Sequence, residues 1–220
     1  MSDHGGFMTI RNAYLDAAAQ AVTLLAAPEV RAAWDGPSAL AELTVGGLAG
    51  HLGYQIFSVT PVLAEQGDAP EAPIPLLEHY ARARWVSAPL DDVVNAGIRT
   101  KGEAFAAEGA LALRERARTE LAEQRVGLPR LPPERSTVFL PQTGWALSLD
   151  DFLVTRMLEL AVHMDDLAVS VGIAAPPLPA AALDPVLALL TRLSVRRHGQ
   201  PGPLRALARA ERLPGAINAL

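Results

Sequence analysis

The sequence predicts an all-α protein, an up-and-down helical bundle with one long crossover and a short C-terminal extension. The chain of 220 residues is rich in alanine and leucine and only 5% of it is aromatic, a composition that favours helices. The segment 152–169 is apolar on most sides and carries a single stripe of polar residues at steps of three and four. That spacing places the polar residues on one face of a helix.

Proline, glycine and capping residues punctuate the predicted helices. In chain order the expected helical segments are 8–27, 28–34, 45–66, 76–125 with a break near Pro89, 152–169 and 185–199. Thr44 and Ser148 are the expected N-caps of the third and fifth of these segments. Asp184 and Pro185 are expected to supply the N-cap and the first-turn proline of the last segment.

Two further features refine this pattern. The stretches 137–140 and 145–147 are expected to be short strands between the helices. The segment 45–66 contains four glycines, at positions 46, 47, 50 and 53, which lower its helix propensity. We therefore expect this helix to pack closely against a neighbouring helix.

The composition excludes several kinds of chemistry. The chain has no cysteine, so a disulfide, a cysteine metal ligand and a protein thiol nucleophile are all excluded. Any thiol chemistry must then use the sulfur of a small molecule. The net charge of −5 argues against non-specific binding of nucleic acid. The sequence shows neither the pattern of a signal peptide nor an apolar run of the roughly 18 residues that a membrane span needs, so we expect a cytoplasmic protein.

The polar stripe of segment 152–169 is the strongest functional signal. Its members are Arg156, Glu159, His163, Asp166 and Ser170. Ionisable groups on a helix that is buried on most sides must be paired or bound to something. Glu159 and His163 lie four residues apart, so both could reach one metal ion.

A third ligand is available in the segment LTVGGLAGHLGYQIFSV. His51 lies there in the middle of an apolar helix, whereas His79 and His198 lie on charged faces that we expect to be exposed. Two imidazoles and one carboxylate leave a coordination position open, as in catalytic zinc sites. From spacing alone two alternatives stay open, namely an ordinary i,i+4 contact and a hydrogen-bonded core histidine.

Two sequence segments carry a resemblance to a known family. LAELTVGGLAGHLGYQIF and LVTRMLELAVHMDDLAVSVG resemble the two signatures of the mycothiol-dependent maleylpyruvate isomerase family, the second with the pattern Arg-x-x-Glu-x-x-x-His-x-x-Asp-Leu. That family belongs to the DinB/YfiT-like metalloproteins. The resemblance implies a DinB/YfiT-like four-helix bundle over residues 1–175. Residues 176–220 would then add a C-terminal helix and a basic tail packed on the bundle.

The resemblance also implies roles for individual residues. It makes His51, Glu159 and His163 the metal ligands. Asp166 and Arg156 become the candidates for the catalytic machinery: Asp166 could orient a ligand or counter Arg156, or it could form a salt bridge without a chemical role. By helical position alone, Tyr54 and Gln55 are expected to line the site as cofactor contacts.

The C-terminal segment is strongly basic. Residues 185–220 hold six arginines against Glu211 alone, a net charge of +5 that leaves −10 for the rest of the chain. The isomerase itself has a substantial second domain after the bundle, whereas 45 residues follow position 175 here. Arg196 and Arg197 are therefore candidates for binding the cofactor. The competing prediction is that the basic segment only packs across the acidic bundle.

These observations predict a metal-dependent enzyme. A divalent metal, expected to be zinc, would activate a low-molecular-weight thiol, mycothiol in this family, for S-transfer to a small electrophile or for its thiol-assisted isomerisation. The alternatives are a non-catalytic metal-containing binding or stress-associated protein, and a bundle without metal. The sequence leaves open the electrophile, the choice among zinc, nickel and iron, and the oligomeric state, a homodimer included.

Overall fold

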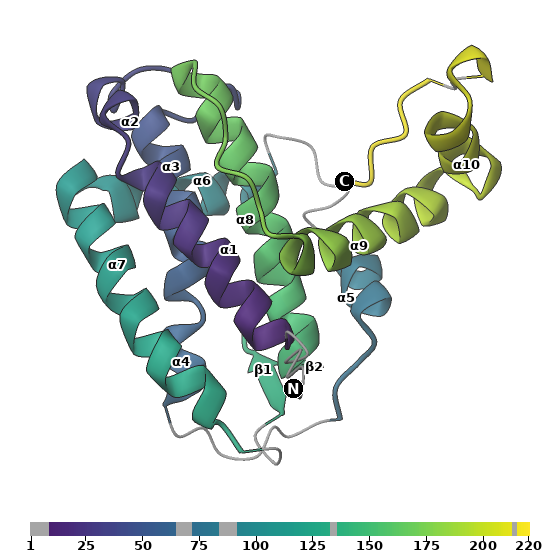
Figure 1. Ribbon diagram of the computed structural model, residues 1–220, viewed down its shortest axis with the longest axis horizontal. Coiled ribbons are helices and arrows are strands. Elements are labelled where there is room, and N and C mark those ends of the chain that lie inside the picture. Colours follow the sequence, from purple (N-terminus) through teal and green to yellow (C-terminus); the bar gives the residue numbers. More distant parts are fainter. Residues whose placement is uncertain (1–8, 65–71, 84–91, 133–135, 213–214) are drawn as a thin grey trace, which may run out of the picture.

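The computed structural model describes residues 9–64, 72–83, 92–132, 136–212 and 215–220, and within these ranges the chain is mostly helical (Figure 1). The elements are α1 (Ile10–Leu25), α2 (Pro28–Ala32), α3 (Val45–Phe57), α4 (Thr60–Leu63), α5 (Leu76–Arg82), α6 (Val93–Ala106), α7 (Ala110–Gly127), β1 (Thr137–Leu140), β2 (Trp145–Ser148), α8 (Leu149–Val171), α9 (Ala180–His198) and α10 (Pro201–Ala208). The predicted all-α class is confirmed, and the two short strands form an antiparallel hairpin. None of the helices among the described residues is long and apolar enough to cross a membrane.

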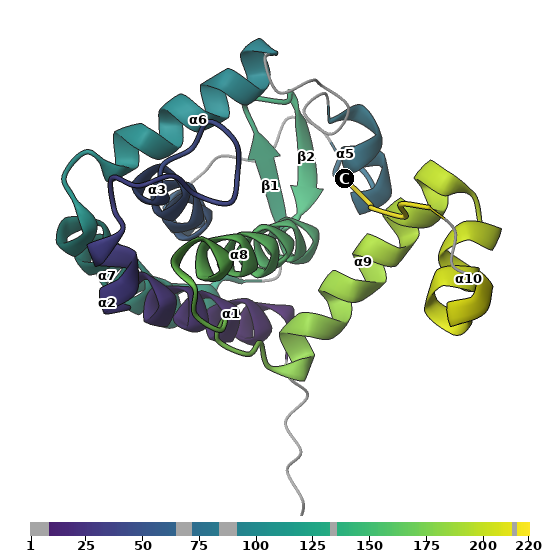
Figure 2. The same cartoon turned by 90° about the horizontal axis from the view of Figure 1, so that it is seen from above.

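Helices α1, α3, α7 and α8 pack on one another around the core. Helix α1 contacts α7 and α8, and α3 contacts the same two helices from the other side (Figures 1 and 2). Fully buried side chains of α8, such as Leu153, Met157 and Leu160, fill the space between them. Burial of this apolar area supplies most of the stability of such a fold.

Local capping fixes the ends of the two helices that matter most for the site. The Thr44 hydroxyl accepts a hydrogen bond from the backbone N–H of Gly47 at 2.8 Å, so α3 begins as predicted. The Ser148 hydroxyl accepts one from the backbone N–H of Asp151 at 3.0 Å and starts α8. Gly172 ends α8 in the left-handed conformation that glycine adopts without strain.

Two predicted helices are shorter than the sequence indicates. Helix α3 ends at Phe57 rather than near Gln66, and the short helix α4, which contains Pro61, follows it. The region 76–125 is divided into α5, α6 and α7. The break between α6 and α7 falls at Gly109, whose φ of 90° is incompatible with a continuing helix. Pro89, the predicted break point, lies outside the described residues.

The predicted start of the last helix is wrong. Helix α9 begins at Ala180 after Pro179, and Pro185 lies inside it. A proline in a helix removes one backbone hydrogen bond, but α9 packs on both α1 and α8 and buries Val186 and Leu189 there. This tertiary packing continues the helix through a residue that favours a helix start.

The glycines of α3 lie at close contacts, as the sequence predicted: Gly47 and Gly50 face α6, Gly46 faces Trp34 and Gly53 faces Leu113 of α7. A Cβ on Gly50 would collide with the carbonyl oxygen of Gly102, and a Cβ on Gly102 would lie 2.6 Å from the carbonyl oxygen of Gly47. The same added Cβ on Gly102 would lie 3.4 Å from the Cβ of His51. Helix α6 therefore supports α3 directly behind His51.

Candidate metal centre

Helices α3 and α8 bring three side chains to one point. His51 comes from α3, and Glu159 and His163 come from successive turns of α8. The Nε2 atoms of the two histidines are 3.1 Å apart. Glu159 Oε2 lies 3.1 Å from His163 Nε2 and 3.9 Å from His51 Nε2. The three side chains are only 14–16% exposed, so the donor atoms meet at the edge of the core.

The separations of the donor atoms fit a metal. Ligand atoms bound tetrahedrally at about 2.0–2.1 Å from zinc are roughly 3.3–3.4 Å apart. The three distances between the donor atoms, 3.1, 3.1 and 3.9 Å, lie on both sides of that value. Two imidazoles and one carboxylate are also the protein ligands of known catalytic zinc sites. The residues present therefore fit a divalent metal with a coordination position to spare.

Asp166 holds the ring of His163. Its Oδ2 lies 3.0 Å from His163 Nδ1, and because a carboxylate only accepts hydrogen bonds, Nδ1 must carry a proton. That proton leaves Nε2 as the nitrogen that faces the other two donors. A carboxylate on the far nitrogen of a ligating histidine is the usual partner that fixes ring orientation. The sequence left two partners open for Asp166, a predicted metal ligand or Arg156. The structure contains the contact with His163.

Burial and neighbouring charges set the protonation of the site. Burial disfavours the charged form of His163, but the carboxylates of Asp166 and Glu159 outweigh it and raise the pKa of His163 to about 9. Burial lowers the pKa of His51, so this ring is neutral at pH 7. Burial also opposes ionisation of Glu159, but the hydrogen bond from His163, together with the nearby His51 ring, holds its pKa far below the usual value.

A second hydrogen-bonded pair lies next to the donors. Arg156 donates from Nη1 to the Gln55 side-chain oxygen at 2.6 Å, and the Gln55 amide nitrogen donates to the backbone oxygen of His51 at 3.0 Å. The same nitrogen lies 3.4 Å from His51 Nε2. Gln55 is only 1% exposed, so its orientation is fixed and the Arg156 cation is held beside the site.

Three other predicted cofactor contacts lie further from this point. Tyr54 packs against α6, where its ring stacks on Phe105 at a centroid distance of 5.6 Å with the Lys101 ammonium over its face. Arg196 donates from Nη1 to the backbone oxygen of Leu77 in α5 at 3.5 Å. Arg197 is exposed in the last turn of α9. Binding of a cofactor by Tyr54, Arg196 and Arg197 stays a prediction.

The sequence reasoning misplaced one further histidine. His79 is only 6% exposed, so its expected place on an exposed face was wrong. Its Nδ1 accepts a hydrogen bond from the Trp145 indole N–H at 3.1 Å, and burial lowers the pKa of His79 to about 4, with a smaller lowering by Arg156 that Glu159 partly offsets. Leu76, Leu77 and Tyr80 around it form an apolar pattern that could have indicated burial of α5, but not the tryptophan partner.

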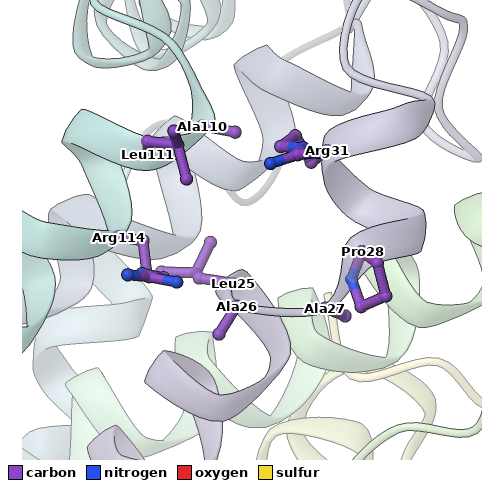
Figure 3. Close-up of a pocket in the computed structure, with 8 residues that line it drawn as sticks. All are labelled: Leu25, Ala26, Ala27, Pro28, Arg31, Ala110, Leu111 and Arg114. Carbon is purple, nitrogen blue, oxygen red and sulfur yellow. The ribbon is translucent and has the colours of Figure 1, made fainter.

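One pocket of the structure lies elsewhere. Figure 3 shows it between the turn that joins α1 to α2 and the first turn of α7, with Arg31 and Arg114 among its lining residues. None of the metal-centre residues lines it. The chemistry of the three donors is therefore separate from this pocket.

Proton release should accompany metal binding. At pH 7.5 His163 carries a proton on Nε2, which a metal must displace, so zinc uptake is expected to release a proton from this residue. The proton release should disappear well above pH 9, where His163 Nε2 has already lost its proton. Asp166→Asn removes the carboxylate that raises the pKa, so it should reduce the release at pH 7.5 and weaken zinc binding about 10–100-fold. Calorimetric zinc titrations in buffers of different ionisation enthalpy measure both quantities, and equal release by the two proteins would contradict this charge assignment.

The fold and the site together define a helical protein with a candidate two-histidine, one-glutamate metal centre. The sequence model described as the mycothiol maleylpyruvate isomerase N-terminal domain matches residues 14–168, which contain His51, Glu159 and His163. The chain therefore belongs to this family. No curated protein and no solved structure matches the chain.

Proposed function

We propose that the protein is a metal-dependent enzyme that activates a low-molecular-weight thiol, with zinc as the metal and mycothiol as the thiol. The reaction would be S-transfer to a small electrophile or its thiol-assisted isomerisation. The observation that carries the proposal is the convergence of His51, Glu159 and His163, with Asp166 behind one ligand, in a member of a mycothiol-linked family. A site with three protein ligands leaves room for a substrate atom.

Each side chain has a distinct part in this proposal. His51, Glu159 and His163 would hold the metal, which when bound favours the thiolate form of a thiol near neutral pH. Asp166 keeps the His163 ring in the orientation that presents Nε2. Gln55 fixes the Arg156 guanidinium beside the ligands, where its positive charge favours bound anions. The absence of cysteine means that the reacting sulfur must come from the thiol cosubstrate.

The proposal extends to the fold. We assign α1, α3, α7 and α8 to the four helices of a DinB/YfiT-like bundle, because these helices pack on one another and two of them supply the ligands. Residues up to about 175 would form the bundle domain. Helices α9 and α10 with the basic tail would form the C-terminal addition.

A thiol-dependent change at the metal tests the proposal. Protein loaded with cobalt is expected to develop a sulfur-to-cobalt charge-transfer band when mycothiol is added, with glutathione and bacillithiol as comparisons. The zinc-loaded protein should consume thiol in the presence of a suitable electrophile, and His51→Ala should abolish that consumption. A metal-loaded protein that gives no band with any of the three thiols would support the non-catalytic binding protein instead.

The basic tail allows a separate prediction. The Ser194 hydroxyl donates to the backbone oxygen of Ile217 at 2.6 Å, and His198 Nε2 lies 2.8 Å from the backbone oxygen of Asn218, so the last residues pack back on α9. Truncation after Gly199 is therefore expected to lower the midpoint of thermal unfolding while leaving thiol affinity nearly unchanged. Loss of thiol affinity at unchanged stability would instead assign the tail arginines to cofactor binding.

A further inference from the structure

Helix α10 turns an apolar face to solvent. The side that faces the rest of the molecule carries three residues that are all at least partly buried: Gly202, Pro203 and Ala206. Leu204 and Leu207 lie one turn apart on the other side and are 63% and 72% exposed. Arg205 is the one charged residue of this helix. A surface helix normally turns charged and polar side chains to water, so we expect a partner to cover this face of α10.

Helix α10 forms a projecting end of the molecule. Figures 1 and 2 both show it at the C-terminal end of α9, with α7 at the opposite end of the molecule. Its contacts among the described elements are chiefly with α9 and with the 3₁₀ turn Ala210–Arg212. A partner helix would need a groove to receive it, whereas an apolar face on a projecting end suits a flat apolar layer.

Positive charge flanks the two leucines. Arg205 lies within α10, and Arg209 and Arg212 follow it; all three are exposed. Among the described residues, none of these arginines forms an ion pair with a carboxylate. Residues 185–220 carry a net charge of +5, from six arginines and one glutamate, whereas the rest of the chain carries −10. An anionic surface would therefore attract the α10 end and repel the bundle, while a symmetric pair of copies would bring these arginines together.

We propose that α10 docks the protein on the surface of an anionic lipid bilayer. Leu204 and Leu207 enter the boundary between the headgroups and the acyl chains, where the apolar side chains of interfacial helices lie. The three arginines bind lipid phosphates with their guanidinium groups, and their apolar stems lie along the acyl boundary. The binding is weak and reversible, because even a single myristoyl chain anchors a protein only marginally. This face lies outside the metal centre of α3 and α8, so the inference does not depend on the proposed function.

Vesicle sedimentation with the 220-residue chain tests the role of charge. Vesicles of phosphatidylglycerol and phosphatidylcholine in equal amounts are compared with vesicles of phosphatidylcholine alone. At low salt the protein should bind the anionic vesicles more tightly, on the order of 10-fold or more, because each arginine near an anionic surface adds to the attraction. Raising the ionic strength to about 0.15 M, where the Debye length is about 8 Å, should reduce this preference. Arg205→Gln, Arg209→Gln and Arg212→Gln together should remove most of it.

The apolar face has its own variant and control. Leu204→Ser combined with Leu207→Ser should weaken binding to the anionic vesicles on the order of 10-fold or more, because less apolar surface leaves water. Leu111→Ser is the matched control, since Leu111 of α7 is 58% exposed at the opposite end of the molecule. Its binding should stay within about twofold of the parent protein, as for a surface substitution outside the contact. These side chains are exposed, so circular dichroism should show the helix content of the parent in each variant.

A single labelled cysteine reports insertion directly. The chain has no cysteine, so Leu207→Cys carries an environment-sensitive fluorophore at one position only. Its emission should shift to shorter wavelength when anionic vesicles are added, because the fluorophore leaves water. The same fluorophore at Leu111→Cys should show no shift.

Three results would overturn the proposal. The first is the absence of binding to the anionic vesicles. The second is binding that persists unchanged in the double serine variant or leaves the Leu207→Cys emission unshifted, since charge alone would then hold the protein. The third is a concentration-dependent dimer in sedimentation velocity that Leu204→Ser with Leu207→Ser abolishes, which would assign the apolar face to a second copy of the chain.

Discussion

His163→Ala is expected to lose most of its bound metal while the helical fold persists, and His51→Ala should do the same. Each variant removes one of three donors, so the loss of affinity should exceed the about 10–100-fold that removing an outer partner costs. The fold should survive because the core is formed by other side chains, among them Leu153, Met157 and Leu160. Metal per chain after gel filtration and helix content by circular dichroism give the two readouts.

The matched control is His198→Ala, which removes an exposed histidine at the end of α9. It should keep the metal content of the parent protein. Glu159→Gln should weaken binding less than either histidine variant, because an amide oxygen still coordinates but brings no charge. Full metal retention by both His51→Ala and His163→Ala would contradict the assignment of these histidines as metal ligands.

Gly50→Ala is expected to destabilise the protein by about 1–3 kcal/mol or more, the range for overpacking a tight core. The new methyl group would meet the carbonyl oxygen of Gly102, which is rigid helix backbone and cannot rotate away. The two helices must therefore separate. Since α6 supports α3 behind His51, the variant should also bind zinc more weakly. Denaturant unfolding and zinc titration measure the two effects.

Gly97→Ala is the control for this substitution. Gly97 lies in α6 as well, but a Cβ there meets nothing within 4 Å. Alanine has the higher helix propensity, so this variant should be stabilised by about 0.5–1 kcal/mol. If both variants unfolded at the same denaturant concentration, the close approach of α3 and α6 would be refuted.

Local spacing explains which parts of the site the sequence could predict. Glu159, His163 and Asp166 follow one another at four and three residues, so helix geometry alone places them together. The prediction of His51 as a third ligand needed two further signals, the second apolar helix and the family resemblance. The structure adds what spacing does not contain, such as the 3.1 Å separation between the two histidine Nε2 atoms.

The features that sequence reasoning missed depend on tertiary contacts. His79 packs against Trp145, 66 residues further along the chain, whose indole N–H satisfies its buried Nδ1. Pro185 lies inside α9 because packing on α1 and α8 outweighs the loss of one backbone hydrogen bond. The glycines of α3 indicated a close neighbour, but only the structure shows that Gly47 and Gly50 meet α6. In each case the deciding partner is distant in the sequence.

X-ray absorption at the zinc edge, with and without mycothiol, tests the central claim most directly. The zinc-loaded protein is expected to show two imidazole nitrogens and a carboxylate oxygen at about 2.0–2.2 Å, and a sulfur neighbour at about 2.3 Å should appear once mycothiol is added. His163→Ala should lose this spectrum along with the metal. A zinc spectrum without imidazole, or an imidazole site that never acquires sulfur, would contradict a thiol-activating centre at His51, Glu159 and His163.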